Sequence, residues 1–274
     1  MTTITRQRDD GAAFLRGFGR QLKLCRERAG LSRAELAELL GYSAELIASI
    51  EQGRRIPQPE FIDRADEVLG AGGLLIAAKD GVEQARYPAF FRDFAKLEAE
   101  ALELHAYDSR VANGLLQTEE YARAVLNTRR PVLDEATLEQ RIATRLARQK
   151  ILHRKPAPLM SFVMEEVLLH RPIGGRDVLK GQLEQLLLVG QQRNVEIQVM
   201  PTNCTDHAGL AGPMTLLDTQ GHRRMGYVEV QAVSRVITEP DRVREMEARY
   251  GLIRAQALTP HESLSHIEKI LGET

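Results

Sequence analysis

Cys204 and His207, with two residues between them, have the spacing of metal ligands. A structural zinc site needs four cysteine or histidine ligands, and the chain's other cysteine, Cys25, lies far earlier in the sequence. We therefore expect a loop that holds no metal. Two distant cysteines also offer no disulfide framework, which fits a reducing compartment.

Three glutamates, Glu165, Glu166 and Glu229, are a second candidate for chemistry, because paired carboxylates can share acid–base catalysis. No acid–base partner accompanies them in the sequence, so we expect them to form salt bridges with arginines. The chain also has no Gly-x-x-x-x-Gly-Lys-Ser loop, no Gly-x-Gly-x-x-Gly, no Gly-x-Ser-x-Gly and no His-Glu-x-x-His. We expect no catalytic residues, no cofactor and no enzymatic activity.

Length and composition favour two folded domains. The chain has 274 residues, of which 43% are hydrophobic and 27% charged. Its formal net charge of −1 argues against a protein that coats nucleic acid through bulk charge, so a DNA contact would need a local basic surface. No apolar run is long enough to cross a bilayer, and residues 1–10 are polar. We expect a cytoplasmic, nucleoid-associated protein without membrane contact.

The elements that position any such surface begin with two helices. Apolar residues at spacings of three and four predict a helix over 14–30. Ser32 and Glu35 have the spacing of a capping box, which starts a second helix. We expect its buried stripe to be Leu36, Leu39 and Leu40.

A link of three residues, 41–43, joins the second helix to a third. Gly41 suits a left-handed helix end, and Ser43 caps the helix predicted over 44–52. So short a link forces a steep crossing, which is typical of a helix-turn-helix. Pro59 starts a further helix, so a bundle of four or five helices results.

Three segments carry a resemblance to a known family: Gly30-Leu31-Ser32-Arg33-Ala34-Glu35-Leu36-Ala37, Gly41-Tyr42-Ser43, and Ile50-Glu51-Gln52-Gly53-Arg54-Arg55-Ile56-Pro57. They resemble the XRE family of phage-repressor-like helix-turn-helix domains. The resemblance implies binding to a double-stranded DNA operator, and it implies that Arg26 and Glu51 form a structural ion pair. The alternative is a helical bundle used for packing or protein contacts.

The exposed start of the third helix is the part that can enter a major groove. We expect base contacts from Ser43, Ala44, Glu45, Ala48 and Ser49, and the resemblance singles out Ala44, Glu45 and Ser49. Glu45 can accept a hydrogen bond from cytosine, and the alanines can touch a thymine methyl group. No arginine occupies these positions, so the operator sequence does not follow.

We expect phosphate contacts from three arginines. Arg33 stands at the N-terminal end of the second helix, where free amides already favour an anion. Arg54 and Arg55 lie just past the third helix, where a phosphate chain would pass. The alternative for each is ordinary solvated charge.

A glycine-rich stretch at 70–73 and the following residues place a domain boundary near 80–90. The fold class is therefore α+β: an N-terminal all-α helix-turn-helix bundle, 1–80, followed by a mixed α/β C-terminal domain, 85–274. We expect the latter to be helical over 88–152 and α/β over 157–274.

In the helical part, Tyr87, Phe90, Phe91 and Phe94 have the spacing of the apolar side of a helix, and the pattern predicts helices over 94–107, 119–126 and 134–151. On the last of these, Arg141, Arg145 and Arg148 form a basic face that we expect to be solvated or to face a partner. In the α/β part, strands 159–164 and 195–200 flank a helix over 178–192, which indicates a parallel βαβ unit. A hairpin of 214–218 and 225–230 follows, then helices over 243–257 and 263–271.

This second part carries its own resemblance, on Leu97-Glu98, Gly114-Leu115-Leu116-Gln117-Thr118, Arg145, Arg148-Gln149, Glu165, Gln182-Leu183, Val199-Met200-Pro201, His207-Ala208-Gly209-Leu210 and Tyr227-Val228-Glu229. It resembles the domain of unknown function that follows the XRE module in actinobacterial WhiJ-like regulators. One departure is Asn113, where members usually have proline. The resemblance implies an antitoxin-like transcriptional regulator with a small partner protein encoded nearby.

The leading hypothesis is a homodimeric regulator whose C-terminal domain supplies dimerisation and binds a partner protein or effector. The competing hypothesis is an α/β ligand-binding or enzymatic domain that is autoregulated through the fused helix-turn-helix. Because 1–80 offers no long apolar stripe beyond its own core, we expect self-association to reside in 85–274.

Overall fold

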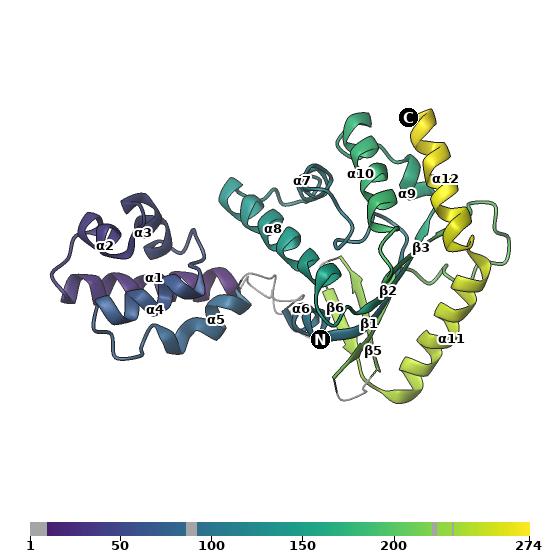
Figure 1. Ribbon diagram of the computed structural model, residues 1–274. Coiled ribbons are helices and arrows are strands. Elements are labelled where there is room, and N and C mark those ends of the chain that lie inside the picture. The colour runs from purple at the N-terminus through teal and green to yellow at the C-terminus, as the bar shows by residue number, and fades with distance from the viewer. Residues whose placement is uncertain (1–9, 86–91, 221–223, 232) are drawn as a thin grey trace, which may run out of the picture. The chain divides into compact units, whose positions relative to one another are not determined.

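The computed structural model describes residues 10–85, 92–220, 224–231 and 233–274. The chain divides into two compact units (Figure 1): residues 1–92 with 134–141, and residues 93–133 with 142–274. The fold is α+β, as predicted, with a helical N-terminal region followed by a mixed six-stranded sheet and its helices. The bounds 1–80 and 85–274 stay a prediction. In the described residues, no helix is long and apolar enough to cross a membrane.

The N-terminal region is a bundle of short helices around one core. Its elements are α1 (Asp10–Arg28), α2 (Arg33–Leu40), α3 (Ala44–Glu51), α4 (Pro59–Val68), the 3₁₀ turn η1 (Ile76–Ala78) and α5 (Lys79–Gln84). Phe18, Leu22, Leu36, Ile47 and Phe61 are among its buried side chains. The core therefore draws on α1 to α4.

Local signals fixed the ends of α2 and α3. The Ser32 hydroxyl accepts from the amide of Glu35 at 3.2 Å, and the Glu35 carboxylate accepts from the amide of Ser32 at 2.7 Å. Gly41 is left-handed at φ +77°, and Ser43 caps α3 through the amide of Leu46. These caps were predicted, but the burial of Leu39 was wrong: it is 51% exposed, because Ala37 takes its place on the core face.

A buried carboxylate shapes the turn after α4. Asp66 accepts hydrogen bonds from the amides of Gly73 at 2.7 Å and Leu75 at 2.8 Å. These bonds satisfy donors that the helix end and the following turn would otherwise leave unpaired. This role was not visible in the sequence, because the partners lie seven and nine residues away.

Asp66→Ala is expected to lower the free energy of unfolding by about 1–3 kcal/mol, because it strands buried amides without acceptors. The matched control is Asp63→Ala on the same helix, since Asp63 pairs with Lys79 at the surface. That exchange should cost at most about 1 kcal/mol. Urea unfolding of the full chain measures both, and equal costs would remove the capping role of Asp66.

The C-terminal unit is built on a six-stranded sheet with the order β3-β2-β1-β4-β5-β6. Its strands are β1 (Ala101–Asp108), β2 (Leu159–Glu165), β3 (Val195–Met200), β4 (Met214–Thr219), β5 (Arg224–Val230) and β6 (Val233–Ile237). The first three are parallel and the others antiparallel. The predicted βαβ unit, β2 to β3, and the predicted hairpin, β4 to β5, are both confirmed.

The helices that lie wholly or partly in this unit are α6 (Arg92–Glu100), α7 (Glu119–Asn127), α8 (Glu135–Arg148) with the 3₁₀ turn η3 (Gln149–His153), α9 (Val167–His170), α10 (Arg176–Val189), α11 (Pro240–Gln256) and α12 (Pro260–Glu273). Of α8, residues 142–148 belong to this unit. Helix α11 packs on one sheet face, where Val243 and Tyr250 join Tyr107 and Val163 in a buried cluster. Helix α12 packs against β3 and α10 (Figure 1). The carboxyl ends of the parallel strands thus lie beside α12 and the loop after β3.

The helix predicted over 94–107 is wrong in its second half, because α6 ends at Glu100 and the next residues form β1. This strand is central and covered on both faces, with Leu104 and Ala106 alternating with His105 and Tyr107. Such a strand lacks a clear polar–apolar alternation. The predicted helical segment 88–152 therefore contains a strand of the sheet.

Of the aromatic cluster, Tyr87, Phe90 and Phe91 lie outside the described residues. Phe94 is buried in α6 and stacks on Tyr227 with ring centroids 3.8 Å apart. For Phe94, the predicted packing role is therefore confirmed. Strand β6 and the short helix α9 had no counterpart among the predicted elements.

Candidate functional site

The outward face of α3 carries the residues expected to read bases. Ile47 and Ile50 face the core, whereas Ser43, Ala44 and Glu45 are exposed and Ala48 and Ser49 partly exposed. The structure therefore brings the five predicted residues together on and just before the free side of α3. A helix with one buried and one free side is what the major groove accepts.

Gln52 extends this face and was missed in the sequence. It is exposed and follows Glu45 and Ser49 at spacings of seven and three, so the three lie along one stripe. Glutamine can pair with adenine through two hydrogen bonds. Its helical spacing from Glu45 was the available signal, but the residue was counted only as part of the helix end.

A buried ion cluster braces α3. The Glu51 side chain is 1% exposed and receives Arg26 Nε at 2.5 Å and Arg33 Nε at 2.7 Å. Desolvation acts to raise the pKa of Glu51, but the hydrogen bonds from both guanidinium groups outweigh it and leave the pKa below its ordinary value. The structure thus joins Arg26 to Glu51, as the resemblance implied, and adds Arg33.

Arg33 consequently has a structural partner in addition to its expected role on phosphate. Its side chain remains 41% exposed, with Nε turned to Glu51. Arg54 and Arg55 are exposed, and their backbone amides donate to the carbonyl oxygen of Ser49 at 2.8 and 3.2 Å. The backbone of these two arginines is therefore held at the end of α3. They are better candidates for phosphate contacts than Arg33, which also pairs with Glu51.

Gly19 sets the distance between α1 and α3. A Cβ atom at Gly19 would lie 2.4 Å from the carbonyl oxygen of Glu51 and 2.5 Å from that of Ile50. Backbone atoms cannot yield as a side chain can, so the close approach requires glycine. The position of α3 therefore depends on Gly19, which the sequence pattern did not single out.

In the C-terminal unit, several of the polar motif residues hold one loop. Gln117 donates to the carbonyl oxygen of Ala112 at 2.6 Å and accepts from Arg145 at 2.7 Å. Gln149 donates to the carbonyl oxygen of Gln117 at 2.7 Å. Gln182 accepts from the amide of Thr118 at 3.0 Å and donates to the carbonyl oxygen of Leu116 at 2.8 Å. The motif around 114–118 is thus a structural element.

The predicted outward basic face of α8 is wrong for two of its members. Arg145 is bound to Gln117, and Arg148 forms two bonds of 2.7 Å with the buried Glu98. Both arginines are partly buried. Their partners come from distant segments, so helical periodicity alone assigned them to solvent.

Asn113 forms the turn before the 114–118 motif with its own side chain. Its side-chain oxygen accepts from the amide of Leu115 at 3.1 Å, and its side-chain nitrogen donates to Asp108 at 3.1 Å. An asparagine that bonds two residues ahead forms an Asx turn, which needs no proline. Desolvation raises the pKa of Asp108 to about 7, although the Asn113 bond acts to lower it.

Asp108→Asn is expected to stabilise the chain at neutral pH. Because the folded pKa of Asp108 is raised, its contribution to stability is present below the unfolded value of 3.8 and is lost as pH rises to about 7. Unfolding free energies of wild type and variant across pH 4–8 test this. Their difference should grow with pH through that window, and a constant difference would contradict the assignment.

Within the part of the chain that the structure describes, the three glutamates pair with tyrosine and histidine and not with arginine. The predicted arginine salt bridges are therefore wrong there. Glu165 accepts from Tyr107 at 2.5 Å and lies 2.6 Å from His207 Nε2. Glu166 lies 2.8 Å from His266 Nε2, and Glu229 accepts from Tyr227 at 2.8 Å.

His207 thus contacts Glu165, and the Cys204 thiol contacts the carbonyl oxygen of Asp206. Within the described ranges, no three histidine, cysteine or acidic residues are grouped for a metal ion. That the chain has no catalytic residues stays a prediction.

Two family models match the chain. Residues 18–78 match a helix-turn-helix domain, and residues 91–269 match a domain of unknown function, DUF5753. The second match covers more than half of the chain. The chain belongs to the DUF5753 family. No curated protein and no solved structure gives a match.

The first match includes α2, α3 and the arginines after them, so the N-terminal region is a helix-turn-helix domain of the kind that binds DNA. The DUF5753 match includes Gln117, Gln149 and Gln182, whose hydrogen bonds hold the loop at 112–118. It also includes the ion pair of Glu98 and Arg148.

Proposed function

We propose that this protein is a sequence-specific transcriptional regulator of the WhiJ-like, antitoxin-like type. The α3 face reads an operator in the major groove, and the DUF5753 domain supplies dimerisation and receives a small partner protein or effector. One observation carries the proposal: a matched helix-turn-helix domain presents Ala44, Glu45, Ser49 and Gln52 free of the core, with Arg54 and Arg55 beside them.

Selection of bound sequences from a random DNA library by the full chain tests the proposal. A dimer reading two half-sites should enrich an inverted repeat whose centres lie about one helical turn apart. Enrichment of no common sequence would contradict a sequence-specific regulator. Repeating the selection with the small protein encoded nearby would show whether a partner changes binding.

Glu45→Ala and Ser49→Ala are expected to relax preference at one or two base pairs. Each should lose about 1–3 kcal/mol on the operator while affinity for random DNA stays nearly constant, because base contacts carry sequence information. Glu38→Ala, an exposed glutamate on α2, is the matched control. Equal losses on operator and random DNA would remove the base-reading role.

Self-association is proposed for the DUF5753 domain. The core around Phe18 and Leu22 is contained within residues 15–82, so a fragment 1–85 has its own core to fold on. Sedimentation should give a dimer for the full chain and a monomer for the fragment, with much weaker operator binding by the fragment. A fragment that binds as tightly as the full chain would contradict this role.

A further inference from the structure

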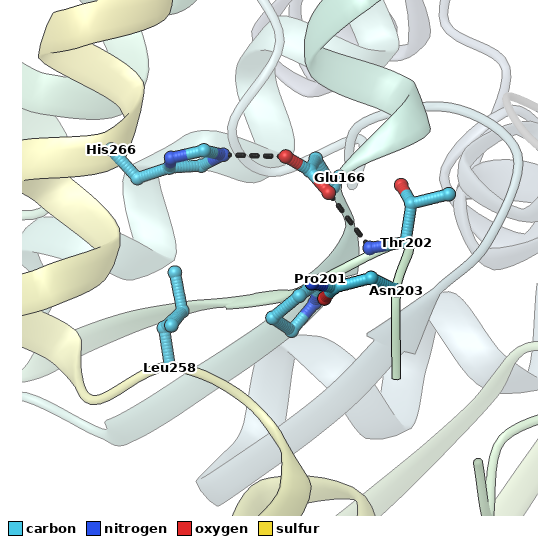
Figure 2. A pocket seen from close by; sticks show the side chains of 6 residues that line it. All are labelled: Glu166, Pro201, Thr202, Asn203, Leu258 and His266. Atoms are coloured by element: carbon cyan, nitrogen blue, oxygen red, sulfur yellow. Dashed lines mark hydrogen bonds and ion pairs between the residues drawn. The ribbon is translucent and has the colours of Figure 1, made fainter. Parts of the chain in front are cut away.

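A pocket of about 540 Å³ opens at the carboxyl ends of β2 and β3. It is lined by Glu166, Pro201, Thr202, Asn203, Leu258 and His266 (Figure 2). Ligand sites in open α/β sheets lie at this edge, because loops and helix ends there converge beyond the strands. Its volume is in the range that holds a small organic molecule.

One carboxylate dominates the polar wall of this pocket. Glu166 lies between His266 and the backbone of Thr202 (Figure 2): its two oxygens are 2.8 Å from His266 Nε2 and 2.7 Å from the amide of Thr202. The hydrogen bond from the Thr202 backbone is the main cause that keeps the pKa of Glu166 below its ordinary value. The group is therefore ionised at neutral pH.

Glu166 retains capacity for a further donor. A carboxylate offers about four lone-pair sites, and His266, the Thr202 amide and the Thr202 side chain use at most three of them. The Glu166 and His266 side chains are both partly open to solvent. Among the described residues that line the pocket, none is lysine or arginine. An entering cation would meet an attractive charge, whereas an anion would be repelled.

The rest of the wall selects for shape. Pro201 and Leu258 offer apolar surface, and Thr202 and Asn203 offer neutral hydrogen-bonding groups. A ligand that fits both parts has a positively charged donor at one end and a hydrocarbon stem that can cover Pro201 and Leu258. Primary amines and guanidines on alkyl or aryl stems have this chemistry.

We propose that the Glu166 pocket binds a small organic cation, a primary amine or guanidine on an apolar stem, as the effector of the regulator. The effector role rests on the proposed function, whereas the binding itself does not. The cation donates to Glu166, and its stem covers Pro201 and Leu258.

Calorimetric titration of the full chain with agmatine, spermidine and phenethylamine tests the binding. At least one should bind, and adipate, a dianion of similar length to agmatine, should not. Glu166→Gln should weaken binding at least tenfold, because it removes the anchoring charge. Glu268→Gln, an exposed carboxylate on α12 outside the pocket, is the matched control and should bind as wild type does.

Asn203→Lys is a second test of the site, for the case in which the Glu166 variant fails to fold. Asn203 is exposed, so the lysine should leave the thermal midpoint unchanged while its ammonium group occupies the pocket and abolishes binding. Failure of all three cations to bind wild type, or equal binding by wild type and Asn203→Lys, would overturn the site. If a cation binds but leaves operator affinity unchanged, the site stands and its effector role is overturned. Absence of an operator would overturn the proposed function without affecting the calorimetry.

Discussion

Glu51→Ala is expected to lower the free energy of unfolding by about 3–5 kcal/mol, because it leaves a buried guanidinium without its partner. The Arg26 side chain is 8% exposed, and among the described residues it has no second carboxylate at comparable distance: its contact with Glu27 is 3.7 Å, against 2.5 Å to Glu51. Arg33 loses the same acceptor. Urea unfolding of the full chain at pH 7 measures the loss.

The pH dependence of the wild type provides a second check on Glu51. Since its folded pKa is lowered, its contribution is present above the unfolded value of 4.5 and is lost as pH falls through the folded value. Glu51→Ala should remove this acid-sensitive part, and Glu38→Ala, an exposed glutamate, should not. A cost for Glu51→Ala no larger than that for Glu38→Ala would contradict the bracing role.

Gly19→Ala is expected to destabilise the N-terminal region by about 1–3 kcal/mol and to weaken operator binding, because the new methyl group would push α3 away from α1. The carbonyl oxygens of Ile50 and Glu51 lie at 2.5 and 2.4 Å from the added atom. Both oxygens belong to α3, the helix proposed to read bases, so stability and DNA affinity should fall together.

Gly17→Ala is the matched control on the same helix. A Cβ atom there meets nothing within 4 Å, so the exchange should stabilise α1 by up to about 1 kcal/mol through helix propensity. Thermal unfolding and an operator titration of both variants decide the matter. If Gly19→Ala behaves like Gly17→Ala, the close crossing of α1 and α3 is not needed.

The helix-turn-helix was predictable because its signals are local. Ser32, Gly41 and Ser43 act on neighbours within a few residues, and the sequence displays both partners of each contact. The contact of Arg33 with Glu51 was not predictable in this way. Its partner Glu51 stands 18 residues later, and periodicity carries no information about which charges meet across helices.

The C-terminal unit shows the same division. The parallel pair β2 and β3 was predicted because both strands are short and apolar and an amphipathic helix lies between them in the sequence. Strand β1 was assigned to a helix, because it follows α6 without a break and is covered on both faces. The Glu166 pocket joins residues that follow β2 and β3, a residue of the link between α11 and α12, and His266 of α12. Its members could therefore be seen as one site only after the sheet had placed them.

DNA binding by α3 and the residues after it is tested by the salt dependence of the affinity. When operator and random DNA are titrated at salt concentrations from about 50 to about 200 mM, the wild-type protein should lose affinity steeply as salt rises. Arg54→Gln with Arg55→Gln should weaken binding to both DNAs and reduce the slope by about 2, one for each lost phosphate contact. Arg33 is left intact in this variant, because it also supports Glu51. An unchanged slope in a folded double variant would show that Arg54 and Arg55 do not contact phosphates.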